Sequence, residues 1–256
     1  MPSQITSWRT CAIRWKSGLV ESGAFAGLRV SADQVAASPL PPLAVQSLGV
    51  VSYPLGLDRQ RELVKARQAG EVPDHLLLLE HSSVITIGVR GRSNPGHLLA
   101  SRAALRDEGI EIHDVARGGD ITYHGPGQLV GYPVLSLKPD RCDVHRYVAD
   151  LEEVLIRTAA RFGVEAGRVP GMTGVWVGNN KLGAIGVRLS RWVTSHGFAF
   201  NVSTNLDHFR FIVPCGLEGR GVTSFQRLLE TPPTRAEVEE ALVTEFAQVF
   251  GRRVLR

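Results

Sequence analysis

The sequence is poor in cysteine and in uninterrupted apolar stretches. Its three cysteines, Cys11, Cys142 and Cys215, lie far apart in a chain of 256 residues, and no CxxC pair occurs. A disulfide framework or a zinc ribbon is therefore not expected, and the reducing environment of the cytoplasm fits this pattern. The longest uncharged stretch, residues 34–57, contains four prolines, so it does not predict a membrane-spanning helix.

The chain also lacks a strong charge of either sign. Its net charge is +4, and no run of lysine or arginine exceeds two residues. This small excess does not indicate a nucleic-acid-binding protein, and it suits an acidic protein partner or an anionic substrate. Arg90 and Arg92, in a loop that contains glycine, are either a solvated pair or a landing site for such a partner. Hydrophobic residues make up 43% and charged residues 21% of the chain, as in an ordinary soluble globular protein.

Residues 1–45 differ in composition from the rest of the chain. They show no sustained periodicity, contain only two acidic residues, Glu21 and Asp33, and end in the proline-rich sequence SPLPPL. This pattern predicts a flexible N-terminal extension, while a weak organelle-targeting segment remains an alternative. We expect one catalytic domain over residues 46–252.

Helices and strands are expected in a mixed order within that domain. Capping residues and apolar positions three or four residues apart predict helices at 58–69, 101–108, 143–162 and 235–251. Short apolar runs predict strands at 76–79, 84–88, 110–115, 129–137, 174–178, 181–189 and 191–202. We expect Asn179 and Asn180 to form a hairpin turn, because asparagine tolerates left-handed backbone positions. The order predicts an α/β (α+β mixed) fold, a mixed β-sheet flanked by helices.

One segment has a composition that a plain connecting loop rarely needs. Residues 117–133, RGGDITYHGPGQLVGYP, contain five glycines together with an arginine, an aspartate and a histidine. Glycine lets a backbone approach a ligand closely, and exposed N–H groups can then donate to an oxyanion. The segment is either a substrate cradle or a tight turn between two strands.

Two residues are candidates for covalent chemistry. Cys215 follows FIVP and precedes a glycine-rich loop, which fits a nucleophile as well as a structural cysteine. Lys181 begins an apolar strand with small residues, LGAIG. It is either a base that loses solvation there or a solvated residue at a hairpin turn.

Metal and nucleotide sites have little support in the sequence. His81, His124 and His196 show no HxH, HxxxH or HExxH spacing, although ligands spread over a fold can still converge on zinc. Asp120 either orients a histidine or caps a turn. The glycines match neither GxxxxGK[ST] nor GxGxxG after a strand, so no mononucleotide loop is indicated.

Three segments in order resemble the lipoyl(octanoyl) transferases of lipoate biosynthesis. They are RGGDITYHGPGQLVGYP, GVWVGNNKLGAIGVRLSRWVTSHGFAFNV and FRFIVPCGLEGRGVTS, and EHSSVITIG at residues 80–88 is similar to an earlier strand of that family. The resemblance covers residues 46–250. It implies the fold of the biotin and lipoate protein ligases.

The resemblance also implies a reaction and a set of site residues. Octanoyl would move from acyl carrier protein to a lysine of lipoyl domains in 2-oxoacid dehydrogenase and glycine cleavage proteins. Cys215 would be the nucleophile, and Lys181 would lower its pKa and act as the base. No cofactor, metal, nucleic acid or membrane is implied, and a cytoplasmic monomer is expected. The acyl substrate would contact Arg117, Gly118, Gly119, Asp120, Ile121, Thr122, Tyr123, His124, Ala184, Ile185, Gly186, Gly197, Phe198 and Ala199.

Three other functions remain open at this stage. An ATP-dependent lipoate or biotin ligase of the same fold would need an adenylate site and no cysteine nucleophile. A zinc-dependent or cysteine hydrolase would use the histidines. A non-catalytic module would only bind acyl carrier protein.

Overall fold

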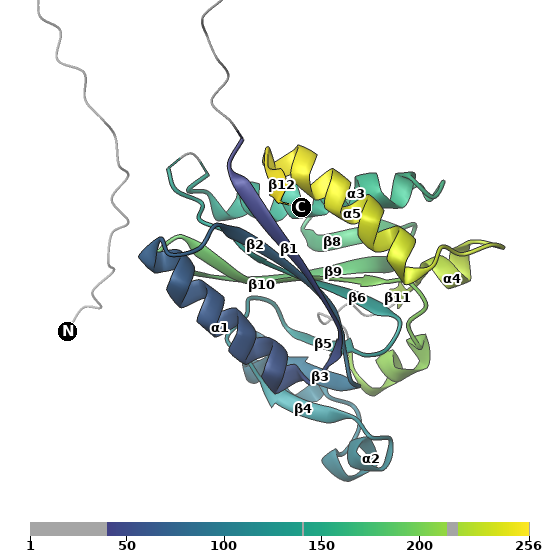
Figure 1. Cartoon of the computed structure of the whole chain (residues 1–256). Coiled ribbons are helices and arrows are strands. Elements are labelled where there is room, and N and C mark those ends of the chain that lie inside the picture. The colour runs from purple at the N-terminus through teal and green to yellow at the C-terminus, as the bar shows by residue number, and fades with distance from the viewer. Residues whose placement is uncertain (1–39, 140, 214–219, 256) are drawn as a thin grey trace, which may run out of the picture. The chain divides into compact units, whose positions relative to one another are not determined.

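The computed structural model describes residues 40–139, 141–213 and 220–255. A large mixed sheet has the strand order β12-β1-β2-β6-β10-β9-β8-β7, and β11 pairs with β9 (Figure 1). Pairing is parallel for β12 with β1, β1 with β2 and β11 with β9, and antiparallel for the other pairs. The strands are β1 (Pro42–Val51), β2 (Asp74–His81), β6 (Gln128–Val134), β7 (Gly167–Val169), β8 (Met172–Val177), β9 (Asn180–Ser190), β10 (Val193–Asn201), β11 (Gly221–Val222) and β12 (Arg253–Leu255).

Helices cover both faces of this sheet, and β2 shows why. Leu76 and Leu78 point into the core beneath α3 (Val144–Ala160) and α5 (Arg235–Phe250), because alternate residues of a strand face opposite sides. Leu77 and Leu79 point to the other face, where they pack in a cluster with Leu63 of α1 (Tyr53–Ala69). All four leucines have no exposed surface, so the uninterrupted apolar run is that of a strand buried on both sides. This confirms the expected α/β class with a mixed sheet and flanking helices.

A small second sheet lies at one end of the molecule. Its order is β4-β3-β5, from β3 (Val84–Ile87), β4 (Glu111–Asp114) and β5 (Ile121–His124). An apolar cluster that includes Ile85, Leu105 and Tyr123 packs around it. The remaining elements are short: α2 (Arg102–Asp107), α4 (Phe225–Leu228), and the 3₁₀ turns η1 (Gly91–Ser93), η2 (Pro95–His97) and η3 (Leu206–Phe211).

Several boundaries differ from the expected ones. Helix α1 begins at Tyr53 rather than at Asp58, with Ser52 as N-cap, because Pro54 stands in the first turn, where its missing N–H costs nothing. Gly178 (φ 55°), and neither Asn179 nor Asn180, takes the left-handed position of the β8–β9 turn. The strand expected from Arg191 begins at Val193 instead.

Residues at both ends of the domain take part in the main sheet. Strand β1 starts at Pro42, ahead of the expected boundary at residue 46, and residues 1–39 lie outside the described residues. The β1–β12 pair joins Pro42 to Arg253, so β12 is the edge strand of the sheet beside β1. Proline is tolerated there because it is the first residue of the strand.

Candidate active site

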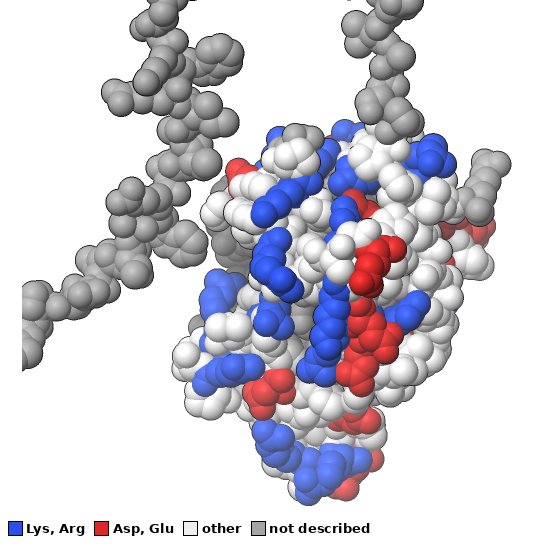
Figure 2. All heavy atoms as spheres, turned by 60° about the vertical axis from the view of Figure 1, so that its left-hand side comes forward, with Lys and Arg blue, Asp and Glu red and all other residues white. Residues whose placement is uncertain are grey.

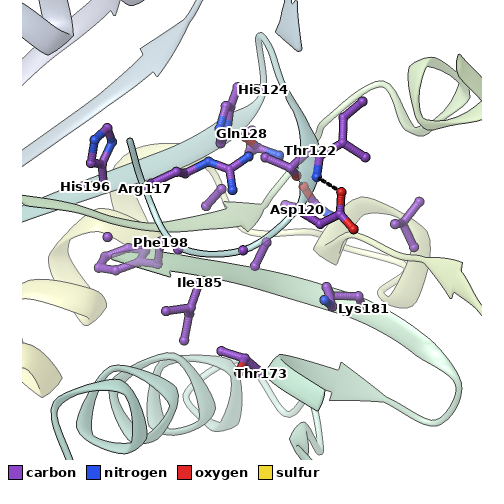
Figure 3. A pocket seen from close by; sticks show the side chains of 18 of the residues that line it. Arg117, Asp120, Thr122, His124, Gln128, Thr173, Lys181, Ile185, His196 and Phe198 are labelled. Atoms are coloured by element: carbon purple, nitrogen blue, oxygen red, sulfur yellow. Dashed lines mark hydrogen bonds between the residues drawn. The ribbon is translucent and has the colours of Figure 1, made fainter. Parts of the chain in front are cut away.

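A cavity opens where the small sheet meets strands β9 and β10 of the large one (Figure 3). Its volume is about 180 Å³, whereas a water molecule needs only about 10–15 Å³ on the same measure. Apolar lining residues include Met172, Ile185 and Phe198, and polar ones include His124 and His196. A cavity with this lining can hold an apolar chain that carries a polar group at one end.

The glycine-rich segment forms one wall of this cavity. Arg117 is only 7% exposed, and its Nη2 donates to Thr86 O and Thr86 Oγ1, each at 2.8 Å. The backbone N–H of Gly118 donates to Val187 O of β9 at 2.8 Å. On its other side the segment is held by the loop after β3, where the N–H of Arg90 donates to Gly119 O at 3.1 Å. The segment is therefore fixed between two strands.

Asp120 serves both of the roles that the sequence left open. Its Oδ1 accepts the N–H of Ile121 at 2.8 Å, which caps the turn into β5. Its Oδ2 accepts a hydrogen bond from His97 Nδ1 at 2.9 Å, which orients that histidine.

Lys181 reaches the cavity because of a β-bulge. The β8–β9 register pairs Val175 with Gly183 but Trp176 with Lys181, so Leu182 is an extra residue on β9. Leu182 is fully buried in the main core, while Lys181 and Ala184 both line the cavity. Lys181 is 6% exposed, and its Nζ lies 4.6 Å from the centroid of the Trp176 ring. The Cζ of Arg220 lies 5.3 Å from the centroid of the same ring, so two cations contact the Trp176 indole.

Three histidines near the cavity are held in their neutral form. Burial is the largest cause that lowers the pKa of His81 to about 4, and of His124 and His196 to about 3. The Arg117 guanidinium lowers the pKa of His124 and His196 further. Imidazole is then available as a hydrogen-bonding group and not as a positive charge.

Hydrogen bonds fix the tautomers of two of these rings. His81 Nδ1 donates to Val51 O at 3.0 Å, so His81 Nε2 accepts from the Tyr132 hydroxyl at 2.7 Å. His124 Nδ1 donates to Gln128 Oε1 at 2.7 Å. Gln128 Nε2 in turn donates to Asn201 Oδ1 at 2.9 Å.

Most residues expected to contact an acyl substrate meet in this one cavity. Those in its lining are Arg117, Gly119, Asp120, Ile121, Thr122, His124, Ala184, Ile185, Gly186, Gly197, Phe198 and Ala199, and the expected base Lys181 lines it too. Gly118 is not among the lining residues, and its N–H is bonded to Val187 O. The Tyr123 hydroxyl lies 2.7 Å from His208 Nδ1 and 3.1 Å from Ser83 Oγ, in the cluster under the small sheet. Cys215 lies outside the described residues, so its position relative to Lys181 stays a prediction.

Other lining residues were not predicted from the sequence. They include Tyr53, Gln128, Tyr132, Met172, Thr173, Asn201, Phe209 and Val222, whereas Arg90, which also lines the cavity, was considered only as a contact for an acidic partner. Gln128 stands inside the glycine-rich segment and could have been singled out as a buried amide beside a histidine. Tyr53 and Phe209 come from elements remote from any motif, and only the fold brings them here.

Within residues 40–139, 141–213 and 220–255, no group of three His, Cys, Asp or Glu side chains could hold a metal ion. Cys142 is exposed and has no disulfide partner among these residues. None of the described helices is long and apolar enough to cross a membrane.

Comparison with known proteins defines the class first. Residues 52–247 match the family model described as the lipoyl protein ligase A/B catalytic domain. Among solved structures, a lipoate protein ligase from Thermoplasma acidophilum superposes with a TM-score of 0.61, at 16% identity over 86% of this chain and 88% of its own. Lipoate-protein ligase A bound with ATP gives 0.61 and 16%, over 85% and 90% of the two chains. At these identities the superpositions show the shared fold alone.

Curated relatives narrow the class to one activity. An octanoyltransferase of Solibacter usitatus is 49% identical over 82% of this chain and 94% of its own length. That of Acidobacterium capsulatum is 48% identical over 81% and 90%. An octanoyltransferase of Myxococcus xanthus is 48% identical, and this chain spans 59% of its length. The chain belongs to the lipoyl protein ligase A/B family and, within it, to the octanoyltransferases, which are acyltransferases.

Proposed function

We propose that this chain transfers octanoyl from acyl carrier protein to a lysine of a lipoyl domain, through a thioester on Cys215 with Lys181 as base. One observation carries the proposal: Lys181, most of the first half of the glycine-rich segment, and the small residues Ala184, Gly186, Gly197 and Ala199 line one cavity. The octanoyl chain is apolar, and burial of each methylene contributes about 0.8 kcal/mol to its binding. Ile185, Phe198 and Ala199 offer an apolar surface for it.

The proposed chemistry needs no ATP. The Cys215 thiolate attacks the carbonyl of the donor thioester, and the carrier thiol leaves, so one thioester replaces another. The amine of the acceptor lysine then attacks the new thioester, the Cys215 thiol leaves, and an amide forms, which is downhill. In the first step Lys181 takes the proton of the Cys215 thiol and returns it to the departing carrier thiolate. In the second step the neutral Lys181 takes the proton of the amine and passes it to the departing Cys215 thiolate. An oxyanion donor in each step would lower the barrier by about 3 kcal/mol.

Arg90, which lines the cavity and is exposed, supports an acidic donor. In Figure 2, Lys and Arg side chains are scattered over the face shown, beside a strip of Asp and Glu. Opposite charges steer association at low ionic strength. Transfer from the carrier protein should therefore slow as salt is raised.

The deciding experiment is intact-mass spectrometry after mixing with octanoyl acyl carrier protein and no ATP. We expect an octanoyl adduct on Cys215 that disappears when a lipoyl domain is added. Lys181→Ala should fold but form the adduct far more slowly. An active enzyme that never carries the adduct would exclude the covalent route, and dependence on ATP would favour a ligase.

A further inference from the structure

His196 has a backbone conformation that a strand residue other than glycine rarely takes. It lies in the middle of β10, paired with Val187 of β9, yet its φ is 55°. A side chain in this left-handed region is strained, and such a residue persists only where its surroundings fix it. The neighbouring Gly197 has no Cβ because one would overlap Gly131 O and Pro133 on strand β6. The chain is thus tightly confined at this point.

Gln60 supplies the contact that holds this conformation. It comes from α1, is 1% exposed, and its Oε1 accepts the backbone N–H of His196 at 2.6 Å. Its Nε2 is buried and has no hydrogen-bond partner among the described residues. A buried, unpartnered amide N–H is unfavourable, so the favourable polar contact of this side chain is the bond that its Oε1 accepts.

This backbone conformation places the imidazole of His196 at the cavity. His196 is 4% exposed and lines the cavity, and Figure 3 shows its ring on the same side as Arg117. The ring lies edge-on to Tyr132, with centroids 6.2 Å apart. Neutral imidazole at this point can hydrogen-bond to a polar group of a bound acyl donor.

We propose that Gln60 is a positioning residue for octanoyl transfer, which holds the His196 backbone so that the imidazole stays in the cavity. This inference rests on the proposed function. Gln60 does not line the cavity and acts only through His196. Without the accepted bond, the His196 peptide relaxes and carries the ring out of place.

Gln68 provides a matched control on the same helix. It also binds the β9–β10 hairpin, through Nε2 to Ser190 O at 2.9 Å and through an Oε1 contact with Arg191, but it does not line the cavity. Gln60→Met therefore removes one contact between α1 and the hairpin, and Gln68→Met removes two. Only the first removes the bond to His196.

The test measures octanoyl transfer and backbone protection in the full chain. We expect Gln60→Met to lower kcat/KM by up to about 100-fold, the loss that a displacement near 1 Å can cause. Gln68→Met should stay near the wild-type value. Hydrogen exchange of the His196 amide should accelerate only in Gln60→Met. In a His196→Ala background, Gln60→Met should add almost no further loss, whereas a purely structural role would add the same loss again.

Opposite results would overturn the inference. They are a Gln60→Met enzyme with wild-type kcat/KM and unchanged His196 exchange, or an equal loss in the His196→Ala background. If Gln60→Met is too unstable to assay, Gln60→Asn withdraws the acceptor by one methylene and the same outcomes decide. Failure of the proposed function shows differently, as a wild-type enzyme without octanoyl transfer, and the exchange measurement then still decides whether Gln60 holds His196.

Discussion

Gly186 shows how closely the glycine-rich segment approaches strand β9. A Cβ at this position would lie 2.9 Å from Gly118 O and 3.2 Å from Arg117 Cδ. Since Gly118 is held by its own bond to Val187, the backbone has little room to yield. Gly186→Ala should displace the cavity wall and cost about 1–3 kcal/mol of stability or transition-state binding.

The measurement for Gly186→Ala is kcat/KM for octanoyl transfer together with thermal unfolding. Gly167→Ala on β7 is the control, because a Cβ there meets nothing within 4 Å and its φ is not left-handed. We expect the control to retain wild-type kinetics. Equal kcat/KM values for the two variants would show that the glycine-rich segment does not form a wall of the substrate cavity.

Trp176 provides the surface on which Lys181 lies. A cation over an indole face gains up to about 2 kcal/mol when it is shielded from water. Trp176→Leu should therefore leave Lys181 less well placed and slow the formation of the acyl-enzyme by roughly tenfold. Trp176→Phe keeps an aromatic face and should be intermediate. Single-turnover acylation, measured below the melting temperature of each variant, tests this expectation. Wild-type rates of acylation in both variants would exclude a role of the Trp176 ring.

One buried carboxylate of β2 bonds to helix α1, to the segment after α5 and to the segment after β6. Asp74, 3% exposed, accepts hydrogen bonds from Arg67 Nε of α1 at 2.7 Å and from Arg252 Nε at 2.9 Å. It also accepts the N–H of Ser136 at 2.9 Å. Removing one member of a buried ion pair leaves the other charges uncompensated, so Asp74→Asn should lower the free energy of unfolding by about 3 kcal/mol.

Urea unfolding checks the Asp74→Asn prediction. Asp58→Asn is the control, because its pair with Arg61 is 63% exposed on both sides and should contribute less than about 1 kcal/mol. A loss at Asp74 no larger than that at Asp58 would contradict the assigned role.

Local chemistry decided which elements could be predicted from the sequence. Helix α5 begins at Arg235 as expected, since Thr234 and Glu237 form a capping box, and it ends at Gly251 in a left-handed cap. The turn at Gly178 was assigned to the wrong residues, because both glycine and asparagine tolerate positive φ. The β1–β12 pair was missed, because no local pattern joins strands from the two ends of a domain.

The cavity is built from segments that lie far apart in the sequence. Motifs predicted the segments around Arg117, Lys181 and Gly197 as parts of a site, and the fold brings all three to one cavity. Tyr53 and Gln60 belong to α1 and carry no motif of their own. Gln60 reaches His196 of β10, whereas Tyr53 packs against His81 and Val84, and both contacts depend on the whole tertiary structure.

The three buried histidines make the stability of the molecule depend on pH. In the folded state burial lowers the pKa of His81 to about 4, and of His124 and His196 to about 3, from an ordinary value of 6.5. Between these values the unfolded chain binds more protons than the folded one, so acid favours unfolding. The contribution of the neutral histidines to the free energy of unfolding is fully present above pH 6.5. It is lost as the pH falls toward 4 for His81 and toward 3 for His124 and His196.

The histidines lower the free energy of unfolding in a higher pH range than the carboxyl groups do. Glu153 and Glu237, whose pKa values are lowered by hydrogen bonds, lose their contribution only below their ordinary value of 4.5. From pH 6.5 to 5 the free energy of unfolding should therefore fall by up to about 1.4 kcal/mol per pH unit for each histidine. Urea titrations at half-unit steps measure this slope. A free energy that stays level down to pH 5 would mean that the three rings are not held neutral, because a neutral buried imidazole must take up a proton when the chain unfolds.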